Sequence, residues 1–457
     1  MKRHIGLFVL LCTAGAGTAA AQDLARIERE IGAVRTAVPD TAFRGGRIYR
    51  TEVVPYDTRH DAEARNRAGA EARIEYRPAA LAAQEDAVLL GQSLDIPYVW
   101  TDGNTYLHLE NVGTAYTLSV NGEEVARTED SSTPADFDLT PYIRQGRNDI
   151  AVTMRRSAAG RIDPAPVSRE AFSGSYLYNQ NKRSIRDFEI ALVPDSTRRF
   201  GILELAIIAQ NSFNYDEPVT VGYDIYSPQG KLLDFNMREV TIPGRSSDTV
   251  RFSPVIYGTY DNRWEATGKN PPLYKVMLFT RREGTYKEYM PLKIGFGKTE
   301  LIDGRLVRLG EELKINKAAY NAAADRKTTL AELKALRAQG RNTICPSAPQ
   351  PAWFYELCDE LGLYVIDCAA IDAPEKRNDR SVGGTPSNDP ALADEYLARV
   401  KAMYYRSRNF TCVAAYALGA PSGNGYCMYK AYEWLKSVEK SRPVICADAD
   451  GEWNTDL

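Results

Sequence analysis

The chain has 457 residues, which is enough for about three domains of ordinary size and too many for one small module. Its 57 Lys and Arg residues against 60 Asp and Glu give a formal charge of −3, so it lacks the basic excess that holds a nucleic-acid backbone. With 44% hydrophobic and 26% charged residues, the composition is that of a globular protein and excludes a mainly disordered chain.

Residues 1–21 have the three-part layout of a secretory signal peptide. Lys2 and Arg3 precede an apolar run, and a tail of small residues ends at Ala21, after which we expect cleavage. No later stretch reaches the roughly 18 apolar residues of a membrane span. The sequence therefore predicts an exported protein without a transmembrane segment, which is periplasmic, associated with an outer membrane, or extracellular.

Residues 22–90 are predicted to form a helical and irregular segment. Leu24, Ile27, Ile31 and Val34 recur at spacings of three and four, which indicates a short amphipathic helix. Residues 57–90 are rich in Ala and charge and show no clear period, so no element is predicted there.

Short alternating strands follow, and they predict an antiparallel β-sandwich over residues 91–194. Asn121-Gly122 lies between two of these strands and is typical of a hairpin turn, because both residues tolerate positive φ. A Pro-, Ser- and Arg-rich stretch at 157–173 is predicted to be a linker or long loop. Further strands at spacings of about 10–20 residues predict a second sandwich of immunoglobulin-like size over 195–303.

The period changes in the last part of the chain, residues 304–457. Predicted strands at 342–345, 363–368, 413–418 and 444–446 alternate with predicted helices at 329–339, 351–361, 390–408 and 429–440. Alternating strands and helices form parallel sheets with both faces covered. The sequence therefore predicts an α/β layer here.

The six cysteines that follow the signal peptide all lie in this last part of the chain. An even number in an exported protein permits disulfides, with 15 full pairings. Several of them lie in apolar patterns, where a free cysteine acts as a small core hydrophobe. The region contains no C-x-x-C motif and no His, so neither a metal site nor a cofactor is expected. The six are Cys345, Cys358, Cys368, Cys412, Cys427 and Cys446.

Several strings together resemble family 2 of the glycoside hydrolases, the β-galactosidase type. Asn121-Gly122, the string 138–142 (D-L-T-P-Y) and the string 146–148 (G-R-N) are similar to its sugar-binding sandwich. The string 357–367 (L-C-D-E-L-G-L-Y-V-I-D) and Arg408-Asn409 are similar to its barrel. These strings occur in the family's order from about residue 95 onward. The resemblance implies a multidomain β plus α/β fold: a jelly-roll-like β-sandwich, an immunoglobulin-like β-sandwich, then a partial (β/α) TIM-type barrel.

The family's chemistry requires two carboxyl groups, one as acid/base and one as nucleophile. The family's acid/base is the Glu of a W-S-x-G-N-E-S-G string. Here that string places Ala420 in the Asn position and Pro421 in the Glu position, and neither side chain can transfer a proton. The family's nucleophile lies on a later strand, near the seventh, whereas this sequence ends at Leu457 after about five strand–helix units. The Glu that follows V-I-D in the family is Cys368 here.

Other acids could stand in for the missing pair. Asp367, Asp372 and Glu375 lie at or just after the third barrel strand, where loops carry function in this architecture. The structural alternative is that Asp372 satisfies backbone groups and that Glu375 lies in a solvated loop. Because acid–base pairs depend closely on geometry, we favour the structural alternative and predict no catalytic residues.

Aromatic side chains could stack on sugar rings, but such residues more often belong to a core. The candidates are Trp353, Tyr416, Trp434 and Trp453. Asn424, in a Gly-Asn-Gly string, is expected to shape a loop. We assign none of these as a carbohydrate-binding residue.

Three functional hypotheses follow. The first is an exported, catalytically inactive family 2-like protein that binds an oligosaccharide, a polysaccharide or a protein in carbohydrate handling. The second is an active glycosidase for β-linked galactosides or related sugars, with residues supplied by a partner or by a further C-terminal region. The third is a structural subunit of a cell-envelope complex, in which a protein partner covers the open barrel edge. Nucleic acid is not an expected partner.

Overall fold

The computed structural model describes residues 47–65, 73–83, 87–110, 112, 115–128, 133–155, 172–266, 269–321 and 325–457. The predicted signal peptide, the predicted helix that begins near Leu24 and most of the predicted linker at 157–173 lie outside these residues. None of the helices within them is long and apolar enough to cross a membrane.

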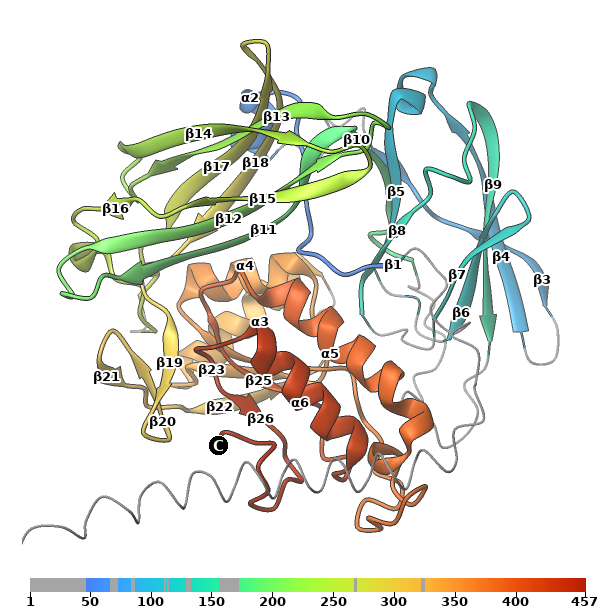
Figure 1. Cartoon of the computed structure of the whole chain (residues 1–457). Helices are drawn as coiled ribbons and strands as arrows, with labels where there is room; N and C mark the ends of the chain where they lie inside the picture. The colour runs from blue at the N-terminus through green and yellow to red at the C-terminus, as the bar shows by residue number, and fades with distance from the viewer. Residues whose placement is uncertain are drawn as a thin grey trace, which may run out of the picture.

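The first sandwich consists of two five-stranded sheets (Figure 1). One contains, in spatial order, β1 (Arg47–Ile48), β8 (Ala135–Asp138), β5 (Gly103–Leu109), β10 (Tyr176–Asn181) and β2 (Arg73–Glu75). The other contains β3 (Ala79–Ala83), β4 (Ala87–Ile96), β9 (Gly146–Arg155), β6 (Tyr116–Val120) and β7 (Glu123–Thr128). Alternate apolar side chains from both sheets form the core, with Leu118, Phe137 and Val152 fully buried.

This sandwich begins earlier than the predicted boundary at residue 91. β1 to β3 precede that position, and β4 crosses it while pairing with β9 over ten residues. Alanine is depleted in strands, so the Ala-rich segment carried little local signal for β structure, although tertiary pairing imposes it. The 3-10 turn η2 (Tyr98–Asp102) belongs to this sandwich. The short helix α2 (Arg59–Ala64) packs instead on the second sandwich, where Ala62 joins Met277, Phe279 and Tyr289 in one apolar cluster.

The second sandwich has the two-sheet architecture of an immunoglobulin-like domain. One sheet contains β11 (Arg183–Pro194), β12 (Gly201–Asn211), β15 (Ser246–Phe252) and β16 (Val255–Ile256). The other contains β14 (Leu232–Ile242), β13 (Glu217–Tyr226), β17 (Tyr274–Arg282) and β18 (Thr285–Ile294). Because β11 pairs with β12 along its whole length, this sandwich begins near residue 183, ahead of the predicted boundary at 195. The 3-10 turn η3 (Tyr260–Asn262) follows β16.

A small three-stranded sheet leads into the last part of the chain; it contains β19 (Thr299–Ile302), β20 (Arg305–Arg308) and β21 (Glu311–Glu312). A five-stranded parallel sheet follows, ordered β22 (Lys317–Tyr320), β23 (Thr343–Pro346), β24 (Tyr364–Cys368), β25 (Val413–Ala417) and β26 (Val444–Ile445). Its helices are α3 (Arg326–Ala338), α4 (Ala352–Leu361), α5 (Ala393–Ser407) and α6 (Tyr426–Val438), with the 3-10 turns η4 (Pro386–Asn388) and η5 (Pro390–Leu392).

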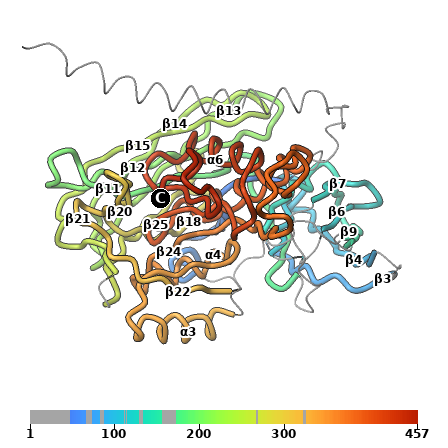
Figure 2. The backbone as a smooth tube through the Cα atoms, turned by 90° about the horizontal axis from the view of Figure 1, so that it is seen from below, coloured from blue at the N-terminus to red at the C-terminus, as the bar shows by residue number. Residues whose placement is uncertain are grey.

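This parallel sheet with covering helices is the predicted partial barrel. Figure 2 shows α3 and β22 at one side of the layer and α6 at the opposite side, with β24 and β25 between them. The six cysteines named above all lie in this part and form no disulfide. Five are buried, and Cys345 is half-buried. Burial raises the pKa of Cys368 to about 12, which keeps that thiol protonated.

A buried ion network joins the first sandwich to the barrel. The guanidinium of Arg406, in α5, donates to Glu52 Oε2 at 2.9 Å and to Glu110 Oε1 at 3.1 Å, and its Nε donates to the Gln350 carbonyl oxygen. The Arg406 side chain is only 7% exposed. Glu110 also contacts His108 Nε2 at 2.8 Å, so the network continues into the sandwich.

Within the sandwich, His108 Nδ1 lies 2.8 Å from Asp136 Oδ1, and Arg50 lies against the other oxygen of Asp136. Burial opposes the charged form of His108, but its hydrogen bonds to Asp136 and Glu110 outweigh burial and raise its pKa to about 10. Burial also opposes the Asp136 carboxylate, and His108 and Arg50 nevertheless lower its pKa to about 2. His108 and Asp136 therefore form a charged pair at neutral pH.

Trp264 joins the second sandwich to the barrel. Its side chain is fully buried and its Nε1–H donates to the Asp359 carbonyl oxygen at 2.8 Å. The ring meets Tyr364 edge to face at 5.5 Å between centroids, and the Arg308 guanidinium lies 4.8 Å from the ring. Gly295 packs against it so closely that an added Cβ would lie 2.5 Å from the indole.

Candidate active site

The candidate active site lies where the parallel strands end. Loops at the carboxyl ends of the strands carry function in this architecture. Here they are the segments that follow β23, β24, β25 and β26, at residues 347–351, 369–385, 418–425 and 446–457.

The loop after β25 contains the acid/base position of the family resemblance. Its backbone is fixed by hydrogen bonds from Leu418 N to the Ile445 carbonyl (2.9 Å) and from Ala420 N to the Ile371 carbonyl (2.8 Å). Gly419 has φ +154 and lies so close to Ile371 that a Cβ would come within 2.9 Å of its side chain and its carbonyl oxygen. Pro421 follows with its side chain exposed to solvent. The loop therefore has a defined shape, and it presents no proton donor at this position.

Ser422 ties this loop to the one that follows β24. Its hydroxyl accepts from Ala373 N at 2.9 Å and donates to the Ala420 carbonyl at 2.9 Å. The Ser422 carbonyl accepts from the hydroxyls of Thr385 (3.1 Å) and Ser387 (2.7 Å). These side chains are buried, so the two loops form one rigid wall.

Asp367 does not reach this surface. It is fully buried, accepts from the Tyr355 hydroxyl of α4 at 2.9 Å, and accepts from Cys368 N at 3.1 Å. Burial raises its pKa to about 6, against the opposing effect of its hydrogen bonds. Its carboxyl therefore lies between sheet and helices, in a structural role.

Asp372 and Glu375 lie in the loop that follows β24. Both side chains are exposed, and neither makes a hydrogen bond or an ion pair with the residues that the structure describes. The expectation that Asp372 satisfies backbone groups is thus not met, whereas Glu375 is solvated as expected. Neither is held in place, although general acid–base catalysis requires a positioned carboxyl group.

Asp448, after β26, is a buried carboxylate of this surface that the sequence reasoning missed. It binds both Nε and Nη2 of Arg377, with Nε at 2.8 Å, and accepts from Gly423 N at 2.6 Å. It thereby joins the loops after β24, β25 and β26. The only sequence signal was its place directly after the last predicted strand, because its partner Arg377 lies 71 residues away.

We predict that Asp448→Ala loosens this junction. The substitution leaves Gly423 N without its acceptor and Arg377 without its carboxylate, which costs about 1–3 kcal/mol for an unsatisfied buried donor. Urea unfolding gives the free energy, and amide exchange at Gly423 gives the local effect. Asp450→Asn is the control: it removes a charge that faces Arg380 and is 82% exposed, it suits the positive φ of this position, and a change within about 0.5 kcal/mol is expected. Equal effects of both substitutions would contradict the assignment.

Three of the four aromatic candidates are packing residues. Tyr416 is fully buried, with the Arg442 guanidinium 4.9 Å from its ring. Trp434 on α6 meets Tyr404 edge to face at 5.8 Å, as expected for a helix face turned to the core. Trp453 packs against Tyr429 at 5.2 Å.

Asn424 shapes the C-terminal segment, as expected for a loop role. It is fully buried, donates to Asn454 Oδ1 at 3.1 Å and accepts from Asn454 Nδ2 at 2.8 Å.

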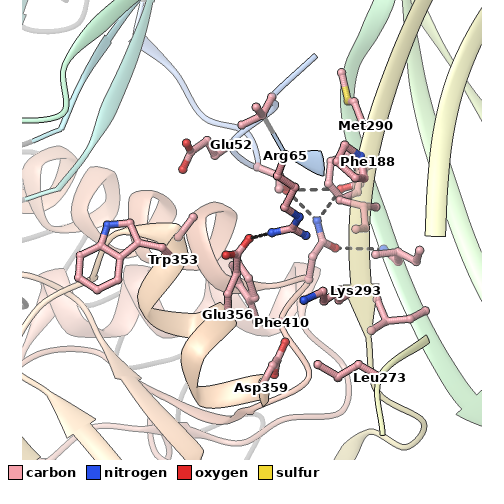
Figure 3. Close-up of a pocket in the computed structure, with 18 of the residues that line it drawn as sticks. Glu52, Arg65, Phe188, Leu273, Met290, Lys293, Trp353, Glu356, Asp359 and Phe410 are labelled. Carbon is pink, nitrogen blue, oxygen red and sulfur yellow. Dashed lines mark hydrogen bonds and ion pairs between the residues drawn. The ribbon is translucent and has the colours of Figure 1, made fainter. Parts of the chain in front are cut away.

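Trp353 lies instead at a cavity between α4 and the second sandwich (Figure 3). This cavity has a volume of about 120 Å³ and is lined largely by apolar side chains, among them Phe188, Met290 and Phe410. Arg65 reaches across it to Glu356. The cavity lies along the outside of α4, so it is separate from the loops that end the strands.

Among the described residues, no three His, Cys, Asp or Glu side chains gather in a group that could hold a metal ion.

The chain combines two β-sandwiches with a parallel α/β sheet, and the candidate site lies at the carboxyl ends of the strands of that sheet. Residues 53–166 match the sugar binding domain of glycosyl hydrolases family 2, and residues 317–456 match the TIM barrel domain of the same family. The chain belongs to glycoside hydrolase family 2.

Curated relatives agree with this membership. The chain is 27% identical to a β-galactosidase of Halalkalibacterium halodurans over 373 residues, which cover 77% of this chain and 35% of the relative. It is 27% identical to a β-galactosidase of Klebsiella pneumoniae over 362 residues, with 75% and 34% covered. The chain thus spans about a third of the length of these relatives.

Solved structures share the fold. A family 2 glycosyl hydrolase from Bacteroides cellulosilyticus superposes with a TM-score of 0.66 at 17% identity, covering 79% of this chain and 48% of that one. A β-glucuronidase of Bacteroides uniformis superposes with a TM-score of 0.66 at 16% identity, with 80% and 46% covered. At these identities the similarity establishes the arrangement of sandwiches and barrel strands.

Proposed function

We propose that this chain is an exported, non-hydrolytic member of family 2 that binds β-linked oligosaccharides or polysaccharides. The observation that carries the proposal is Pro421 at the acid/base position, in a loop whose backbone is fixed from both sides. Export rests on the layout of residues 1–22. Glycan binding rests on the match to the family's sugar binding domain.

The chemistry at the strand ends supports a role without hydrolysis. Hydrolysis needs two carboxyl groups at a set separation across the scissile bond, about 5–5.5 Å for retention and about 6.5–9.5 Å for inversion. Of the carboxyl groups described above, Asp367 is enclosed under the sheet and Asp448 is held by Arg377. Asp372 and Glu375 are exposed and unheld. None of these four carboxyl groups is both free to react and held in position, so they do not form a catalytic pair beside Pro421.

We expect no turnover when the purified chain is incubated with aryl β-galactosides, aryl β-glucuronides and natural oligosaccharides. General acid–base catalysis alone contributes a factor of about 10²–10⁴, and Pro421 cannot supply it. Released aglycone and reducing ends are measured beside an active family 2 β-galactosidase. Saturable heat of binding for the same oligosaccharides, without their cleavage, is the expected result. Cleavage that is abolished by changing one acidic side chain would refute the proposal.

A second candidate is an active glycosidase for β-linked galactosides or related sugars, with residues supplied by a partner or by a further C-terminal region. The exposure of Asp372 and Glu375 on the loop after β24 favours it, because both carboxyl groups are accessible to a ligand. In this case cleavage survives in Pro421→Ala and is lost in Asp372→Asn.

The third alternative is that the chain binds a protein instead of a glycan. If the chain neither binds nor cleaves the oligosaccharides, the glycan-binding role is excluded. A stoichiometric protein that co-purifies with the exported chain and protects an edge of the barrel sheet from amide exchange would then identify the ligand.

A further inference from the structure

β14, which has eleven residues, is a long edge strand in the described part of the chain. It pairs with β13 on one side, and no other described strand lies along its second side. Both views place β14 at the periphery of the molecule (Figures 1 and 2). A long edge of this kind exposes a row of unpaired backbone groups, which most proteins protect by shortening, charging or covering it.

The side chains of β14 are sorted between its two faces. Phe235 and Met237 lie on the outer face and are 68% and 46% exposed. Asp234 and Arg238 lie on the inner face, since Asp234 accepts from the hydroxyl of the buried Tyr223 and the Arg238 guanidinium lies 5.1 Å from the Phe252 ring. The outer face is therefore apolar at Phe235 and Met237, with Glu239 next to them, and the inner face carries one charge of each sign.

This pattern is complementary to itself. When two copies of β14 pair antiparallel about a twofold axis through Asn236, Phe235 of each copy faces Met237 of the other. The same register places Asp234 of each copy opposite Arg238 of the other. Directly opposed side chains lie about 4.5–5.5 Å apart, so both pairs are in contact range.

Neighbouring registers lose this match. An axis through Met237 would set Glu239 against Phe235 and Asp234 against Val240, which opposes carboxylates to apolar groups. An axis through Phe235 would set Arg238 against Leu232. The centre at Asn236 also sets Glu239 against Leu233, but it is the one of the three that places Asp234 opposite Arg238 and Phe235 opposite Met237.

We propose that β14 is a homodimer interface, in which it pairs antiparallel with β14 of a second copy about Asn236. The pairing joins the two four-stranded sheets that contain β14 into one continuous sheet. It satisfies the free backbone groups of both edges, and it buries Phe235 and Met237. The interface does not involve the candidate active site, so it stands or falls independently of the proposed function.

Light scattering on the purified full chain tests the dimer. We expect twice the mass of one chain at concentrations of about 10–100 μM, and we expect Phe235→Lys to raise the dissociation constant at least about a hundredfold, because it places two ammonium groups in the apolar contact. Tyr257→Lys, in the same sandwich and 69% exposed, is the control and should remain dimeric. A monomeric parent chain, or a dimer unaffected by Phe235→Lys, overturns the proposal. Circular dichroism confirms that both variants are folded.

Cross-linking tests the register. Asn236→Cys places two thiols directly opposite one another, at a Cα separation of about 4.5–5.5 Å that suits a disulfide. Arg238→Cys is the matched control on the same strand, because its two copies lie four residues apart, about 13 Å, which is too far for a disulfide. We expect oxidation to cross-link the first variant at least tenfold faster than the second. Equal rates, or no cross-link in either, overturn the assigned register.

Discussion

Replacement of Arg406 by Met lowers the free energy of unfolding by about 3–5 kcal/mol at neutral pH, because it removes the buried guanidinium from Glu52 and leaves Glu110 with His108 as its remaining cation. Glu52 and Glu110 both bind this guanidinium, at 2.9 and 3.1 Å. Met fills a similar volume, so the loss is electrostatic. The measurement is urea unfolding, followed separately by a probe in the first sandwich and one in the barrel.

The pH dependence distinguishes this cause from lost packing. Burial raises the pKa of Glu110, but Arg406 and His108 outweigh burial and hold that pKa below its usual range. Without Arg406 the pKa of Glu110 moves upward, so a proton can relieve the uncompensated charge. The deficit of Arg406→Met should therefore be full at pH 7 and shrink as the pH falls toward about 4. A deficit that is independent of pH would contradict the electrostatic account.

Arg305→Met is the matched control for this experiment. Arg305 also pairs with a carboxylate, Glu312 at 3.0 Å, but the two side chains are 68% and 58% exposed. Exposed pairs contribute about 0–1 kcal/mol, so a change within about 0.5 kcal/mol is expected. A comparable loss in both variants would show that the enclosure of the network at Arg406 has no special effect.

Trp264→Ala is expected to cost about 3–5 kcal/mol, the usual price of a large aromatic removed from a packed core. The indole is fully buried between the second sandwich and the barrel, against Tyr364, Arg308 and Gly295. Its loss leaves a cavity at the joint between the two domains. Differential calorimetry should show a lower transition temperature and a separation of the sandwich and barrel transitions.

Trp264→Phe refines this experiment. It retains most of the ring volume but removes the Nε1–H that binds the Asp359 carbonyl at 2.8 Å. A loss of about 1–3 kcal/mol is expected, from the unsatisfied carbonyl and the smaller ring. If Trp264→Phe lowered the free energy of unfolding as much as Trp264→Ala, the hydrogen bond rather than the packing of the ring would account for most of the stabilisation at this joint.

The sequence predicted the barrel part of the fold well, because its strands are apolar and its helices have a clear period. β24 and β25 occupy the predicted segments, and α4 and α5 begin within a few residues of the predicted starts. Strands that are buried on both faces read as continuous apolar runs, which is a strong local signal.

Two kinds of strand were missed for physical reasons. β3 and β4 lie in an Ala-rich segment with low intrinsic preference for strands, and they are fixed by the pairing of β3 with β4 and of β4 with β9. β14 is exposed along most of its length, so no buried face imposes an alternating pattern on its sequence.

The sequence predicted that the candidate site lacks its proton donor, but it did not predict the contacts that join the loops of the site. Pro421 follows directly from the alignment of one string with the family's acid/base motif. The pairing of Asp448 with Arg377 and the bond from Asp448 to Gly423 depend on loops that meet only in the folded chain. Local sequence patterns carry no information on such contacts.

The loop after β25 has a further consequence. Main-chain bonds to Ile371 and Ile445 and the Ser422 hydroxyl hold its course, and none of these bonds uses the side chain of residue 420 or 421. Shape and reactivity are thus encoded by different residues of the same five-residue stretch. Because of this separation, a catalytic side chain can be lost or gained at the acid/base position while the hydrogen bonds that hold the loop remain.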